Sequence, residues 1–360
     1  MNGIVFLHGK MLVSAIMIIH KVQKDLKMSK IAVVGVEENL GREVLTLLAE
    51  KGIKVKDVQA VSPRSVMGNM ISYGEDDELD ILNLEQFDFK SVEVAIFTTT
   101  AEIAKKYIPA AIKQGAKVID ASGSSAGNPD VAMVLSGFND DKINPDNISV
   151  VSVPSPEVTQ MLRPLQSLHQ QFVVKRIVVS TYSSTSAYGR AGMDELFNQT
   201  RKIFMNDTLA DDQNVFHKQI AFNVIPHLGE FIGEETICEW AFNAETKQIL
   251  GGDAKVHANC AVVPAFIGSA QYINVEFAKE VDVDQAKDCM KKTKGIIVFD
   301  KQVDGGYVTL NDVQGEDSIY ISRLRQDMSI ENGISFWCVA DNLRSASAHN
   351  ILSILNLLKK

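Results

Sequence analysis

Short apolar runs separated by amphipathic stretches make up the first part of the chain. The apolar runs lie at 30–34, 55–61, 92–98, 117–120 and 148–153. They predict strands buried on both faces, because a half-exposed strand would alternate apolar and polar residues. The stretch 43–50 carries Val44, Leu47 and Leu48 on one helical face, and 107–113 is also helical in pattern. Strands alternating with helices at this spacing predict a doubly wound parallel α/β sheet.

The pattern changes after Pro156. The stretch 158–171 is typical of an amphipathic helix interrupted by Pro164, and 191–204 of a long helix. Strand-like runs follow at 176–182, 255–261, 270–276, 296–298 and 335–339, and a terminal helix at 342–358. We therefore expect a second, α+β domain with a mostly antiparallel sheet.

The first 27 residues have a different character. Met11 to Ile19 is an apolar run flanked by lysines, and it is too short for a bilayer, which needs about 20 apolar residues. It resembles the core of a signal peptide, but no small-residue cleavage site precedes Met28. Because the first predicted strand begins just after Met28, we interpret residues 1–27 as an upstream extension.

Composition narrows the range of functions. A net charge of −9 argues against a nucleic-acid partner, because phosphate-binding surfaces are usually basic. The four cysteines form no C-x-x-C pair, which argues against a zinc site, and we expect no metal. Four cysteines in 360 residues fit a protein in the reducing cytoplasm. We also expect no association with a membrane.

The turn after the first strand has the context of a dinucleotide-binding fingerprint. Glycines there allow a tight turn, close approach of the pyrophosphate and close helix–strand packing. Gly35 and Gly41 are present, but the middle position is Glu38, next to Glu37. Two carboxylates would repel a pyrophosphate. The turn therefore predicts a nucleotide-binding fold whose binding site is weakened.

A second feature favours nucleotide binding. Ser62, Arg64 and Ser65 follow the second strand. An arginine with two hydroxyls can hold a ribose 2′-phosphate through charge-assisted hydrogen bonds, which would select NADP. A solvated turn is the alternative, and the spacing alone does not decide between them.

Segments along the whole chain resemble the aspartate-semialdehyde dehydrogenase family. They are the 35–41 turn, 62–65, 118–122, 128–131, 219–226, 245–250 and 341–344. The resemblance implies an NADP-binding Rossmann domain at 28–156, completed by a helix at 341–358. It also implies a glyceraldehyde-3-phosphate-dehydrogenase-like α+β dimerisation domain at 157–340, a homodimer, and Asn342 among the cofactor-binding residues.

The same resemblance places non-functional residues at each catalytic position. The nucleophilic cysteine is replaced by Pro156 and the histidine base by Ser269. The remaining departures are Val262 and Ala126 for two substrate arginines, Ala241 for a lysine and Ser183 for a glutamine. Proline offers neither a nucleophile nor a backbone N–H. The chain is most similar to the divergent Usg-like branch that lacks the catalytic cysteine, and we assign it no catalytic residue.

Three hypotheses follow from the sequence. The first is a non-catalytic homologue that acts by residual nucleotide binding or protein interaction. The second is an NADP-dependent aspartate-semialdehyde dehydrogenase with altered catalytic residues, and the lack of any cysteine near 153–159 argues against it. The third is a structural subunit that pairs with an active paralogue.

Overall fold

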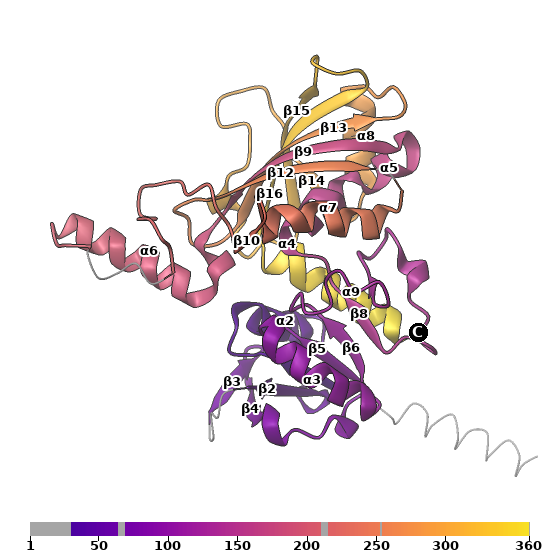
Figure 1. The fold of residues 1–360 in the computed structure, drawn as a ribbon, viewed down its shortest axis with the longest axis vertical. Coiled ribbons are helices and arrows are strands. Elements are labelled where there is room, and N and C mark those ends of the chain that lie inside the picture. Colours follow the sequence, from indigo (N-terminus) through magenta and orange to yellow (C-terminus); the bar gives the residue numbers. More distant parts are fainter. Residues whose placement is uncertain (1–29, 64–68, 210–214, 253, 360) are drawn as a thin grey trace, which may run out of the picture.

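The computed structural model describes residues 30–63, 69–209, 215–252 and 254–359. They form two α/β domains, one above the other in Figure 1, as the sequence predicts. Within these ranges, none of the helices has the combined length and apolar character needed to cross a bilayer.

The first domain is built on an eight-stranded sheet with the order β3-β4-β2-β1-β5-β6-β8-β7. Its strands are β1 (Ile31–Val34), β2 (Val58–Ser62), β3 (Met70–Tyr73), β4 (Asp77–Asn83), β5 (Val94–Phe97), β6 (Lys117–Asp120), β7 (Ala132–Met133) and β8 (Val150–Ser152). All pairings are parallel except that of β3 with β4. Helices α2 (Asn39–Glu50) and α3 (Ala101–Lys113) connect the central strands, which confirms the predicted doubly wound topology.

The end of the chain packs on the first domain. A π-helical turn at Arg344–Ala348 leads into α9 (His349–Leu358). Ile351 and Ile354 of α9 are fully buried in the same apolar cluster as Val44 and Leu47 of α2. Helix α9 thus supplies part of the core on one face of the first sheet (Figure 1).

The second domain holds a six-stranded sheet with the order β12-β9-β13-β16-β15-β14. Its strands are β9 (Val174–Ser183), β12 (Lys255–Val262), β13 (Ser269–Phe277), β14 (Ile296–Val298), β15 (Ile319–Gln326) and β16 (Gly333–Ala340). The three central pairings are antiparallel and the two outer ones parallel. A two-stranded hairpin, β10 (Phe231–Ile232) and β11 (Glu235–Thr236), precedes the last helices of this domain.

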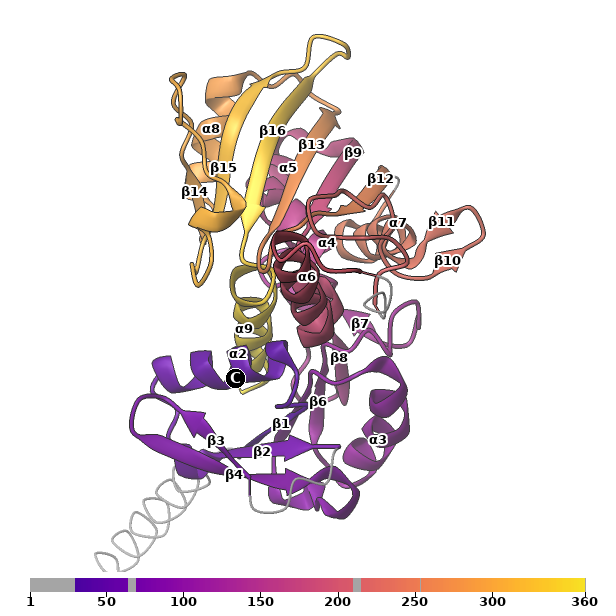
Figure 2. The same ribbon diagram turned by 90° about the vertical axis from the view of Figure 1, so that its left-hand side faces the viewer.

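Helices cover one face of this sheet (Figure 2). They are α4 (Pro156–Leu162), α5 (Gln166–Phe172), α7 (Ile237–Leu250) and α8 (Val283–Lys292). Pro164 lies in a 3-10 turn between α4 and α5, which is the predicted interruption. Helix α6 (Gly189–Phe204) projects away from the body of the molecule (Figure 1).

The opposite face of the second sheet carries aromatic side chains. The ring of Trp337 on β16 lies near those of Tyr182 on β9 and Tyr272 on β13, with centroids 5.9 and 4.8 Å away. Tyr272 is 37% exposed. The indole Nε1 of Trp337 donates to the carbonyl oxygen of Val308, and Val308 and Val313 pack in the same apolar cluster. The sheet therefore has one face covered by helices and one aromatic face that is partly covered by the segment before β15.

Candidate functional site

Strand order in the first sheet reverses between β1 and β5. Strands β1 and β5 are parallel neighbours, and the chain leaves β1 toward β2 on the other side. Nucleotides bind outside the carboxyl ends of the strands at such a switch point. Gly35 follows β1 at this place, and Thr99 follows β5.

The geometry of the turn requires both of its glycines. Gly35 has a φ of +103°, and a Cβ built on it would lie 2.7 Å from the backbone nitrogen of Thr99. A Cβ on Gly41 would lie 2.2 Å from the carbonyl oxygen of Gly35. These contacts are internal to the strand–turn–helix unit. Retention of the two glycines therefore reports the fold of the turn and does not by itself report nucleotide binding.

Glu38 stands where the fingerprint calls for its middle glycine. It is the N-cap of α2, and its Oε2 lies 3.9 Å from the position of a Cβ on Gly189, the first residue of α6. The carboxylate is thus placed between the N-termini of two helices, where the helix dipoles favour a negative charge. It takes up the electrostatic position that a ligand phosphate would use.

Of the other polar groups at this edge, some would oppose the binding of a nucleotide and others would favour it. Oε2 of Glu37 is buried and has no hydrogen-bond partner among the described residues. Nδ2 of Asn39 and Oγ1 of Thr99 are likewise buried and without partners there, and both can donate to a ligand. The turn fits a dinucleotide in shape, but the carboxylates of Glu37 and Glu38 do not fit its pyrophosphate.

The other predicted cofactor residues are only partly described. Ser62 is buried at the end of β2, opposite Asn83 of β4. Arg64 and Ser65 lie outside the described residues. Oδ1 of Asn342 accepts hydrogen bonds from the backbone N–H of Gly268 (3.0 Å) and from Oγ of Ser186 (3.1 Å). Asn342 therefore fixes the turn that leads into α6, next to the Glu38 carboxylate.

The positions of the expected catalytic groups converge in the second domain. Ser183 at the end of β9 is in register with Val262 of β12 on one side and with Ser269 of β13 on the other. Pro156 is the first residue of α4. Nε2 of Gln271 on β13 donates to the carbonyl oxygen of Glu157 across 2.9 Å, which ties the start of α4 to this sheet. The fold thus assembles the site, but with proline, valine and serine side chains.

Two buried carboxyl groups flank Pro156. Glu245 of α7 is 6% exposed and accepts hydrogen bonds from both N and Oγ of Ser155. Burial raises the pKa of Glu245 to about 7, against the lowering effect of the Ser155 hydrogen bonds, and the charge of Glu157 adds to the rise. Burial also raises the pKa of Glu157, against the lowering effect of its own backbone amide and the Ser183 hydroxyl. Both groups hold protons more tightly than exposed carboxylates do.

Two thiols that are distant from Pro156 in sequence lie near these carboxyl groups. Sγ of Cys260 on β12 donates to Sγ of Cys238 on α7 across 3.3 Å. That hydrogen bond, burial and the charges of Glu157 and Glu245 strongly raise the pKa of Cys238. A raised pKa disfavours the thiolate, the form in which cysteine is a nucleophile. Sequence spacing did not indicate this proximity, which arises only when α7 packs beside β12.

The two positions at which the family resemblance expects phosphate-binding side chains, Ala126 and Ala241, lie on segments that are close together. Cη2 of Trp240 lies 3.5 Å from the position of a Cβ on Gly127. This contact brings the loop containing Ala126 next to the helix containing Ala241. Neither alanine can bind an anion through its side chain. Across the described ranges, no three His, Cys, Asp or Glu side chains gather in a way that could hold a metal ion.

A doubly wound sheet with a glycine turn at its switch point, joined to a mixed-sheet α+β domain, defines the class of two-domain nicotinamide-nucleotide dehydrogenase folds. Residues 30–145 match the model of the semialdehyde dehydrogenase NAD binding domain, and residues 165–345 match that of the semialdehyde dehydrogenase dimerisation domain. The chain therefore belongs to the aspartate-semialdehyde dehydrogenase family, as its relatives also indicate.

Similarity to these relatives extends over nearly the whole chain. The aspartate-semialdehyde dehydrogenase of Rickettsia bellii is 34% identical over 336 residues, which cover 93% of this chain and 98% of the relative. The crystal structure of aspartate semialdehyde dehydrogenase II from Vibrio cholerae has a TM-score of 0.87 at 30% identity, covering 92% of this chain and 99% of that one. A structure of the same enzyme complexed with ASA has a TM-score of 0.85 at 30% identity, covering 92% and 98%.

Proposed function

We propose that this protein is a non-catalytic homologue of aspartate-semialdehyde dehydrogenase that acts by binding. The observation that carries the proposal is Pro156 at the nucleophile position, as the first residue of α4. Its neighbour Ser155 is held by Glu245, and the backbone of Glu157 is held by Gln271. Removing a nucleophile–base unit typically costs about 10⁶-fold in rate.

The loss extends to the groups that would support a nucleophile. Ser269 at the base position is buried, and its Oγ has no hydrogen-bond partner among the described residues. A serine hydroxyl is a far weaker base than imidazole near neutral pH. Val262 at the carboxylate-binding position is fully buried in the apolar core of the second domain. Neither side chain can replace the group that the family resemblance expects at its position.

Residual NADP binding is part of the proposal, with low affinity. The match to an NAD binding domain and the intact glycine turn support binding. The carboxylates of Glu37 and Glu38 oppose it, since each like-charge contact with a phosphate costs on the order of 1–4 kcal/mol near a protein surface.

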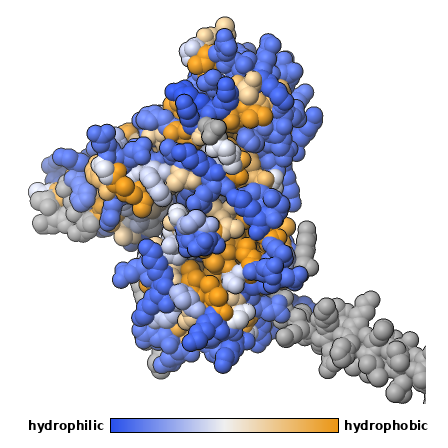
Figure 3. Space-filling model, turned by 45° about the vertical axis from the view of Figure 1, so that its right-hand side comes forward, coloured by the Kyte–Doolittle hydropathy of each residue, from blue (hydrophilic) through white to orange (hydrophobic). Residues whose placement is uncertain are grey.

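The protein also assembles as a homodimer through its second domain in this proposal. The match to a dimerisation domain supports it, and the partly exposed ring of Tyr272 on the second sheet offers an aromatic contact. Apolar residues also gather on the projecting arm at the left of Figure 3. Phe204 of α6 and Phe222 are 79% and 63% exposed, with ring centroids 5.8 Å apart. Obligate dimers usually bury more than about 2,000 Å² of such surface.

The proposal also covers the bounds of the two domains and the location of the protein in the cell. We place the first domain at 28–156 with 341–358, the second at 157–340, and an upstream extension at 1–27. The four cysteines are free thiols in the structure, which supports a cytoplasmic location.

A second candidate is an NADP-dependent aspartate-semialdehyde dehydrogenase with altered catalytic residues. The closeness of Cys238 and Cys260 to Glu157 favours it, because it supplies thiols to the same region. The raised pKa of Cys238 opposes it. A structural subunit of an active paralogue is a third candidate, and co-purification with that paralogue from the native cell tests it.

Covalent trapping separates the first two candidates. The family resemblance implies a cysteine thioester, which accumulates when phosphate is omitted. The protein is incubated with aspartate semialdehyde and NADP without phosphate, and its intact mass is measured. We expect the mass of this protein to be unchanged. The Rickettsia bellii enzyme is the positive control, and its mass should increase by that of the acyl group. An acyl adduct on Cys238 or Cys260 would replace the non-catalytic proposal with the second candidate.

A further inference from the structure

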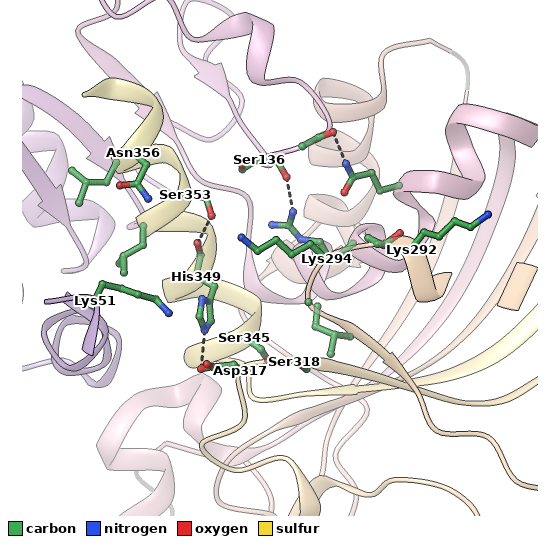
Figure 4. A pocket seen from close by; sticks show the side chains of 18 of the residues that line it. Lys51, Ser136, Lys292, Lys294, Asp317, Ser318, Ser345, His349, Ser353 and Asn356 are labelled. Atoms are coloured by element: carbon green, nitrogen blue, oxygen red, sulfur yellow. Dashed lines mark hydrogen bonds and ion pairs between the residues drawn. The ribbon is translucent and has the colours of Figure 1, made fainter. Parts of the chain in front are cut away.

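A cleft of about 690 Å³ lies between the two domains, away from the nucleotide turn (Figure 4). It is formed by the C-terminal end of α2, by α9 and by the segment that joins α8 to β14. Its size is within the range of small-molecule sites. The nucleotide turn is at the other end of α2, a helix of 12 residues or about 18 Å. The two sites are therefore separate.

Basic side chains from both domains enter this cleft. In Figure 4, Lys51 after α2 and Lys294 after α8 point from opposite sides toward His349 of α9. Lys292 also belongs to the lining but points away from that centre. Neither Lys51 nor Lys294 forms an ion pair with a carboxylate of the described residues. Their charges are available to a ligand.

Arg163 adds an enclosed positive charge. Its guanidinium donates to the carbonyl oxygen of Ser136 (2.5 Å) and to Oδ1 of Asn350 (3.4 Å), and it pairs with no carboxylate of the described residues. Burial lowers the pKa of Arg163 to about 10, although the charge of Asp140 opposes the shift. A cation removed from water without a carboxylate in direct contact is costly. An anion in the cleft would relieve that cost.

Asp317 is the acidic residue of the lining, and its charge is already compensated. Its Oδ1 lies 2.6 Å from Nε of Arg344 and 2.9 Å from Nε2 of His349. Burial raises the pKa of Asp317, but these hydrogen bonds outweigh that effect and hold the pKa below its usual range. Asp317 thus fixes the His349 ring without cancelling the charges of Lys51 and Lys294.

One wall of the cleft is apolar. It consists of Leu48, Ile53, Ile319, Leu352 and Leu355, of which only Ile53 is more than 7% exposed. The cleft therefore combines a cationic end with a small apolar contact, mainly at Ile53.

We propose that this cleft binds a small phosphorylated molecule, with its phosphate between Lys51 and Lys294 and its body on the apolar wall. A phosphate dianion has three acceptor oxygens, which two ammonium groups and the Ser318 hydroxyl can satisfy together. Because Lys51 and Lys294 come from different domains, the ligand would bridge the domains. The proposal does not depend on whether the protein is catalytic.

Adenosine monophosphate is the probe, titrated by calorimetry at low ionic strength into the intact protein. We expect saturable binding that is tighter than that of inorganic phosphate, which has no body to contact the apolar wall. Changing Lys51→Met together with Lys294→Met should weaken binding at least about tenfold, or about 1.4 kcal/mol. The control Lys292→Met should change it less than about twofold. The three lysines are exposed, and their loss leaves the cores intact.

Two results would overturn the proposal. One is the absence of saturable binding of adenosine monophosphate to the unmodified protein. The other is binding that is unaffected by the Lys51 and Lys294 changes but strengthened by Glu38→Gly, which would place the nucleotide at the turn after β1. The second result leaves the proposal of a non-catalytic homologue untouched, because that proposal concerns Pro156.

Discussion

Both the backbone N–H and the hydroxyl of Ser155 donate to Oε2 of Glu245, each across 2.8 Å. Ser155 is the N-cap of α4 and directly precedes Pro156. The segment at which the family resemblance expects a nucleophile is therefore fastened to α7 by a buried carboxyl group. These two hydrogen bonds stabilise the turn.

The Glu245 carboxyl makes stability depend on pH. Its pKa is about 7 in the folded protein and 4.5 ordinarily, so the folded protein retains a proton that the unfolded chain releases. The resulting stability is fully present below about pH 4.5 and is lost as the pH rises through about 7. The size is about 3 kcal/mol, from 1.36 kcal/mol for each pKa unit. Glu157, with a pKa raised by burial, acts in the same direction.

Urea unfolding of Glu245→Gln at pH 5.5 and pH 8, at one protein concentration, tests this relation. The unmodified protein should be less stable at pH 8, and the variant should show a clearly smaller difference between the two conditions. Exposed Glu234→Gln is the matched control and should behave like the unmodified protein. An equal pH dependence in all three proteins would show that Glu245 does not carry the effect.

Changing Glu38→Gly should strengthen NADPH binding. Removing the carboxylate clears the N-terminus of α2 and restores backbone approach to a pyrophosphate. We expect at least about a tenfold gain in affinity by fluorescence titration, equivalent to about 1.4 kcal/mol. Glu38→Gln separates charge from backbone freedom. Glu102→Gln, in the first turn of α3, changes net charge equally and should have little effect. Micromolar binding by the unmodified protein would mean that the carboxylates do not obstruct the site.

The protein should be a dimer of about twice 39.6 kDa in light scattering, and should remain so on dilution to nanomolar concentration. Phe222→Asp should produce a monomer, because it places a charge on an exposed apolar surface next to Phe204. Met328→Asp is the control, since Met328 is 89% exposed on the loop between β15 and β16. A monomeric unmodified protein at micromolar concentration is incompatible with the proposed assembly.

Arg344 should be important for the junction between the domains. It contacts Glu43 and Glu50 of α2 at 2.7 and 2.6 Å and Asp317 of the second domain at 2.6 Å. Arg344→Met should lower the free energy of unfolding by about 1–3 kcal/mol, since solvent screens the partly exposed carboxylates. Arg190→Met breaks an exposed i,i+4 pair with Asp194 and should cost less than 1 kcal/mol. Equal losses in the two variants would assign Arg344 no special role.

Local patterns in the sequence were enough to predict most of the first domain. Buried parallel strands are continuous apolar runs, and β1, β5 and β6 all lie where such runs predicted them. In the second domain, β15 was not predicted. A bulge between Ser322 and Arg325 shifts its alternation, so that Ile321 and Leu324 are both buried despite being three residues apart.

Helix α7 was also missed, because its apolar residues do not gather on one face. Its capping box, formed by Thr236 and Glu239, was the signal that could have located its start. The grouping of Glu157, Glu245 and Cys238 could not be predicted from sequence, because it depends on how α4 and α7 pack against the second sheet.

Steady-state turnover tests the absence of catalysis most directly. The unmodified protein, made in a host that lacks its own aspartate-semialdehyde dehydrogenase, is assayed for phosphate-dependent reduction of NADP with aspartate semialdehyde, beside the Rickettsia bellii enzyme. Loss of a nucleophile and base typically reduces the rate by about 10⁶-fold, so we predict a rate equal to that without protein. A rate that increases in proportion to protein concentration and requires both phosphate and NADP would contradict the account.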